Sequence, residues 1–66
     1  MKPIRVVGQG EVTLDELRAM FLAYMNAGAP EPLLEGTPQE RRAILQQVAM
    51  GADTQMRALV DSYLRS

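Results

Sequence analysis

The tetrapeptide TLDE at residues 13–16 and the tetrapeptide TPQE at residues 37–40 are both capping boxes. In such a box, a threonine hydroxyl accepts a hydrogen bond from the amide of a glutamate three residues later, and the glutamate carboxylate accepts one from the threonine amide. Both motifs therefore predict helix starts. Pro38 supports the second start, because proline is favoured at the first position of a helix.

The first helix is predicted over about residues 14–27. Apolar side chains recur there at helical spacing, and glycine at position 28 with proline at position 30 is typical of a helix end. The stripe consists of Leu14, Leu17, Phe21 and Tyr24. Residues 29–36 then form a proline-containing connector, for which Pro30 and Pro32 favour an extended path.

The second helical region is predicted over about residues 38–64. Its apolar residues keep a spacing of four and three across Gly51, which favours one long helix and a helical hairpin. They are Leu45, Ala49, Ala52, Met56, Leu59 and Tyr63. Alternatively, Gly51 breaks the helix and Asp53 caps a third one. The residues leave both arrangements open.

The N-terminal residues 1–12 are predicted to contain a short strand or an extended arm. Residues 4–7 include Ile4, Val6 and Val7, whose β-branched side chains suit a strand. Such a strand pairs with another chain, folds back through the GQG sequence at residues 8–10, or remains an arm. The expected fold is therefore a single small, mainly α domain spanning residues 1–66.

The composition argues against catalysis. The 66 residues include no cysteine and no histidine, which removes disulfides, the commonest metal ligand and the commonest general base. The stretch GQGEVT at residues 8–13 lacks the third glycine of a dinucleotide-binding fingerprint and the lysine of a P-loop. We therefore expect no enzyme activity, no cofactor and no metal site.

The charge and hydropathy pattern predicts a cytoplasmic protein. The net charge of −1 differs from the strongly basic balance of a general nucleic-acid binder. No apolar run reaches the ~20 residues that span a membrane, and no signal peptide is recognisable.

Several apolar residues exceed what one helical hairpin can bury, which indicates a binding surface. Leu22 and Met25 lie beside the main stripe of the first helix, and Leu33 and Leu34 lie in the polar connector. The adjacent arginines in the first turn of the second helix oppose its dipole, so they favour an acidic partner or pair with nearby glutamates. The candidate partner-binding residues are Ile4, Val6, Leu22, Met25, Leu33, Leu34, Arg41 and Arg42.

These features predict a small protein–protein interaction module, either an adaptor or inhibitor of a larger protein or a homodimer. The alternative is a DNA-binding regulator, because the order and length of the elements resemble the ribbon–helix–helix family. The resemblance implies a dimer whose strands pair between chains and enter the major groove. The sequence departs from that family because each face of the strand carries a single basic residue, Lys2 or Arg5.

Overall fold

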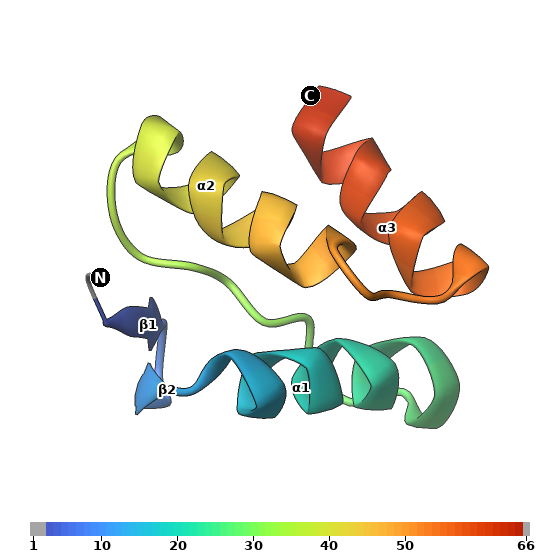
Figure 1. Ribbon diagram of the computed structural model, residues 1–66. Helices are drawn as coiled ribbons and strands as arrows, with labels where there is room; N and C mark the ends of the chain where they lie inside the picture. The colour runs from blue at the N-terminus through green and yellow to red at the C-terminus, as the bar shows by residue number, and fades with distance from the viewer. Residues whose placement is uncertain (1–2, 66) are drawn as a thin grey trace.

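The computed structural model describes residues 3–65 and contains a short β-hairpin followed by helices (Figure 1). In Figure 1, α2 and α3 diverge from the turn that joins them, and α1 lies across their lower side. The mainly α prediction is confirmed, and residues 1 and 2 of the predicted arm lie outside the described part of the chain. The elements are β1 (Ile4–Val6), β2 (Gly10–Val12), α1 (Leu14–Ala27), α2 (Pro38–Ala49) and α3 (Thr54–Arg65).

Both predicted capping boxes are present. The Glu16 amide donates to the Thr13 hydroxyl over 3.1 Å, and the Thr13 amide donates to the Glu16 carboxylate over 2.9 Å. Thr37 and Glu40 form the same pair of hydrogen bonds, both 3.1 Å long. These reciprocal bonds use amides that have no partner within the first turn of a helix, which explains why α1 and α2 start where the sequence predicts.

The second helical region is broken after Ala49, so the single long helix over residues 38–64 is wrong and the three-helix alternative is confirmed. Gly51 has a φ of +81°, a left-handed conformation that ends a helix readily only at glycine. Two residues later, the Asp53 carboxylate accepts a 2.8 Å hydrogen bond from the Met56 amide and caps α3. The apolar spacing continues across the break because both helices face the same core.

The N-terminal strand folds back within its own chain. β1 pairs antiparallel with β2, with Ile4 opposite Val12 and Val6 opposite Gly10. The other edge of β1 pairs with the connector, where Val6 faces Leu34. There, the amide of residue 7 donates to the carbonyl of residue 33 over 2.8 Å, and the amide of residue 35 donates to the carbonyl of residue 5 over 2.9 Å. Both edges of β1 are therefore used inside the chain.

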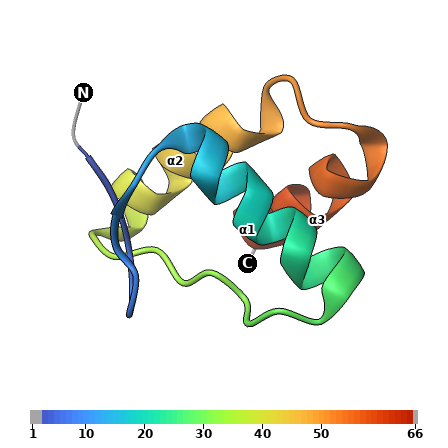
Figure 2. The ribbon, with the colours of Figure 1, turned by 90° about the horizontal axis from the view of Figure 1, so that it is seen from below.

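The core is formed by side chains of β1 and of all three described helices. Figure 2 shows these elements from below, with α1 crossing in front of α2 and α3 and the sheet at the left. The inward-facing β1 side chains Ile4 and Val6 are only 9% and 1% exposed, respectively. The prediction that these two residues contact a partner is therefore wrong. Side chains alternate between the two faces of a strand, and the face that carries both residues packs on the helices. The buried core cluster consists of Ile4, Val6, Leu17, Phe21, Val48, Met56 and Val60, and Pro32 of the connector is buried as well.

Arg18 connects α1 to the end of α2, a contact that the sequence did not suggest. Its Nη2 donates to the carbonyl of Gln47 over 3.1 Å and to the carbonyl of Met50 over 2.7 Å. Its Nη1 lies 3.4 Å from the Asp15 carboxylate. Because the last carbonyls of a helix carry partial negative charge, the guanidinium satisfies them and complements the α2 dipole.

The helix caps predict a specific stability pattern. Thr13→Ala, Thr37→Ala and Asp53→Ala should each lower the free energy of unfolding by ~1 kcal/mol, because each change removes the acceptor for an amide of the first turn. Urea unfolding followed by circular dichroism measures the change. Thr54→Ala is the matched control, because Thr54 is the first residue of α3 and Asp53 caps that helix. Equal losses for Thr54→Ala and Asp53→Ala would contradict the assigned cap.

The Arg18 contact gives a second prediction. Arg18→Met keeps an apolar stem but removes the donors to the two α2 carbonyls, so it should cost about 1–2 kcal/mol of unfolding free energy. Arg57→Met on the exposed side of α3 should cost much less, since Arg57 is exposed. The same urea titrations compare them, and similar losses for the two variants would argue against the capping role.

Candidate functional site

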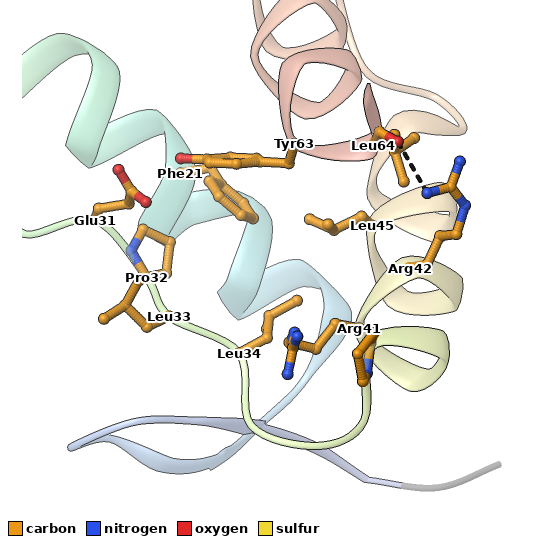
Figure 3. A pocket seen from close by; sticks show the side chains of 11 residues that line it. Phe21, Glu31, Pro32, Leu33, Leu34, Arg41, Arg42, Leu45, Tyr63 and Leu64 are labelled. Atoms are coloured by element: carbon orange, nitrogen blue, oxygen red, sulfur yellow. Dashed lines mark hydrogen bonds between the residues drawn. The ribbon is translucent and has the colours of Figure 1, made fainter. Parts of the chain in front are cut away.

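A groove with a volume of about 330 Å³ opens between α2, α3 and the connector (Figure 3). It lies where α2 and α3 have diverged, at the start of α2 and the end of α3. We call it the α2–α3 groove. It is lined by Phe21, Glu31, Pro32, Leu33, Leu34, Pro38, Arg41, Arg42, Leu45, Tyr63 and Leu64.

Two guanidinium groups border the α2–α3 groove on its α2 side, and Figure 3 shows them apart, Arg41 near Leu34 and Arg42 near Leu64. Arg41 Nη1 donates to the Gly36 carbonyl over 2.5 Å, and Arg42 Nη1 donates across the groove to the Leu64 carbonyl over 2.9 Å. These acceptors are backbone carbonyls rather than the glutamates that the sequence suggested as alternative partners. A carbonyl bond orients an arginine without neutralising its charge, and a guanidinium has further N–H donors to offer.

Aromatic side chains and one carboxylate stand at the other end. The rings of Phe21 and Tyr63 lie 6.0 Å apart between centroids, tilted by 42°. Burial and, to a smaller extent, the Glu31 carboxylate raise the pKa of Tyr63 to about 12. A hydrogen bond to Glu31 raises the pKa of Tyr24 above its usual value. Figure 3 shows Glu31 and the hydroxyl of Tyr63 on the side away from the arginines.

The structure brings together only part of the predicted binding surface. Leu33, Leu34, Arg41 and Arg42 all line the α2–α3 groove, and Leu33 is 56% exposed. Leu22 and Met25 were predicted to share an apolar patch with Leu33 and Leu34, but neither lines this groove. Leu22 is 40% exposed on α1, whereas Met25 packs partly buried against the core.

The contributions of α3 and of Glu31 to the groove are not apparent from the sequence. In the sequence pattern, Tyr63 belongs to the apolar stripe of a long helix. The break at Gly51 turns α3 back along α2, and this reversal places Tyr63 and Leu64 opposite Arg42 and Leu45. No local motif marks that proximity, because it depends on how two helices pack. Gly51 is the one sequence feature that could have indicated it, because a helix that ends there lets the following helix fold back along α2.

A second hollow, of about 250 Å³, lies between α1, the start of β1 and the outer side of α2. Its walls are mainly apolar, with the carboxylates of Glu35 and Glu40 at the margin. Glu40 already serves the capping box of α2, which gives it a structural role. The residues that line it are Pro3, Ile4, Leu14, Glu35, Glu40, Ala43, Ile44 and Gln47.

The groups in the α2–α3 groove are suited to binding. Guanidiniums bind carboxylates or phosphates, and an apolar floor with a few polar groups is typical of ligand sites. Within residues 3–65, no cluster of three or more aspartate, glutamate, histidine or cysteine side chains is placed to hold a metal ion. In the same part of the chain, every helix is too short or too polar to cross a bilayer.

Comparisons of the chain with protein-family models, with curated proteins and with solved structures find no match.

The tyrosines give a pH-dependent prediction. Because the folded state holds the Tyr63 proton more tightly than the unfolded state, stability should fall as the pH rises from the ordinary tyrosine pKa towards about 12. Phenolate absorbance should show Tyr63 ionising after Tyr24. Glu31→Gln should lower the pKa of Tyr24 towards its usual value but that of Tyr63 only in part, because burial is the larger cause there. Tyr24→Phe and Tyr63→Phe assign the two signals, and ionisation of Tyr63 before Tyr24 would contradict the described environment.

Proposed function

We propose that the chain is a cytoplasmic, non-catalytic protein-binding module that takes a segment of a partner protein into the α2–α3 groove. In this role it acts as an adaptor or inhibitor of a larger protein. The observation that carries the proposal is that Leu33, Leu34, Arg41 and Arg42, all selected from the sequence as partner contacts, line one groove.

The construction of the groove supports this role. Its walls come from α1, the connector, α2 and α3, so the folded chain holds them in place before any partner arrives. The volume of about 330 Å³ suits a few side chains rather than a folded domain. The exposed side chain of Leu33 at the margin and the apolar groups in the floor would be buried when a partner binds. Burial of such groups supplies most of the free energy of binding.

The alternative of a ribbon–helix–helix DNA-binding regulator has less support. That arrangement needs an open strand edge for pairing with a second chain, whereas both edges of β1 are occupied. The residues facing Arg5 across the small sheet are Glu11 on one side and Glu35 on the other. A row with acids on both sides of a single arginine does not favour contact with phosphates.

Site-specific photo-crosslinking tests the proposal. Benzoylphenylalanine replaces Leu33 in the groove or, as the matched control, exposed Gln55 near the start of α3. In cells that produce the protein, the groove position should give a light-dependent adduct with a specific protein, and the control position should not. The purified partner should then bind the unmodified chain. Its affinity should fall about tenfold for Arg41→Gln and stay unchanged for Arg57→Gln.

Identical adducts at the two positions, or equal affinity of the purified partner for the Arg41→Gln variant, would contradict the proposal. An adduct that contains only a second copy of the chain would assign the groove to a homodimer instead. Native mass spectrometry of the purified chain distinguishes that outcome.

A further inference from the structure

Resting on the proposed function, we propose that the segment bound in the α2–α3 groove is an acidic–apolar peptide. A bulky apolar side chain of the peptide lies on the floor formed by Phe21, Leu34 and Leu45. An aspartate or glutamate carboxylate within two residues of it binds the guanidinium of Arg41, which lies beside Leu34 (Figure 3).

The charge argument begins with the internal contacts of the two arginines. Each guanidinium is held in place by a bond from Nη1 to a backbone carbonyl, which leaves further N–H donors for a ligand. Both residues belong to the start of α2, where the helix dipole is positive and repels cations. The arginines and the dipole therefore make the α2 side of the groove favourable for an anion, and a carboxylate matches the planar fork of the Arg41 guanidinium beside the apolar floor.

The opposite end of the groove restricts where the acidic residue of the peptide can lie. Glu31 lies there and interacts with the hydroxyl-bearing rings of Tyr24 and Tyr63. A second carboxylate at that end would be repelled, whereas a neutral or apolar residue would be accepted. The acid of the bound segment consequently lies near Arg41, and the peptide residues nearer to Glu31 are uncharged.

The floor between the two ends is apolar and partly open. Phe21 is buried in the core, whereas Leu34 and Leu45 are only partly covered by the chain itself. A leucine or phenylalanine from a peptide would remove these exposed parts from water. An apolar floor of this kind has no counterpart in recognition of a phosphate backbone, which is why a protein segment fits the groove better than a nucleic acid.

Selection from a random dodecapeptide library displayed on phage tests the ligand class. With the full chain immobilised, the enriched sequences should place leucine, isoleucine or phenylalanine within two residues of aspartate or glutamate, relative to the input library. The most enriched sequence is then synthesised with a fluorescent label and an amidated C-terminus. This form restricts the test to side-chain carboxylates, and fluorescence anisotropy measures its affinity.

A double-mutant cycle separates recognition from a loss of stability. Replacing the acid in the peptide by its amide should weaken binding about tenfold, and Arg41→Gln in the chain should do the same. The two changes together should weaken binding no more than either alone, because they remove the same contact. Arg57→Gln is the control in the chain, and replacing the apolar residue of the peptide by serine should also abolish most of the affinity.

Several results would overturn this inference. They are the absence of an enriched sequence class, enriched peptides that bind equally without their acid, and effects of the acid and of Arg41 that multiply independently. None of these results contradicts the proposed function, because the protein crosslinked at Leu33 could bind through a basic or purely apolar segment. Failure of the proposed function is seen separately, as equal crosslinking at positions 33 and 55.

Discussion

The pairing of the connector with β1 is the interaction on which the arrangement of the groove depends. Two backbone hydrogen bonds, of 2.8 and 2.9 Å, fix residues 33 and 35 against the strand. Val6 and Leu34 face each other between these bonds, and Val6 is almost completely buried. A segment with little local structure of its own thereby becomes a rigid wall opposite α2. Without this pairing, Glu31 and Leu33 would have no fixed position relative to the arginines.

The helix ends show how a chain without disulfides holds its helices together. Side-chain oxygens of Thr13, Thr37 and Asp53 accept amides at the three starts. Guanidinium groups of Arg18 and Arg42 donate to carbonyls at the ends of α2 and α3. The threonine and aspartate caps are local in sequence, whereas the arginine contacts join separate helices. Polar groups that each helix leaves unsatisfied are thus used to dock it against its neighbour.

This difference between local and distant contacts explains what the sequence could predict. The starts of α1 and α2 were predicted correctly because each capping box lies within four residues. The break at Gly51 was one of two alternatives, since the apolar spacing is the same whether one helix or two cover a core. The inward face of β1 was assigned to a partner because nothing in residues 4–7 shows that the helices of the same chain will cover that face.

The candidate groove was only partly predictable for the same reason. Leu33, Leu34, Arg41 and Arg42 were selected because each is unusual for its local position, whether an apolar residue in a polar connector or a cation at a helix start. Leu22 and Met25 were selected because a two-helix hairpin cannot bury apolar residues on so many sides of the first helix. In the three-helix arrangement, Met25 packs against the core, so the reason for selecting it no longer applies. Residues that conflict with their local surroundings were therefore better guides to the groove than surplus hydrophobicity.

The Arg42 contact links the groove to the stability of the fold. Its guanidinium lines the groove and also holds the last turn of α3 through the Leu64 carbonyl. An occupant of the groove contacts walls from both α2 and α3, so it requires the arrangement of the two helices that this hydrogen bond holds. Binding at the groove and closure of α3 onto α2 then favour the same conformation. A ligand that binds only this folded form stabilises it by mass action, so the contact between Arg42 and the end of α3 and the binding of a ligand support each other.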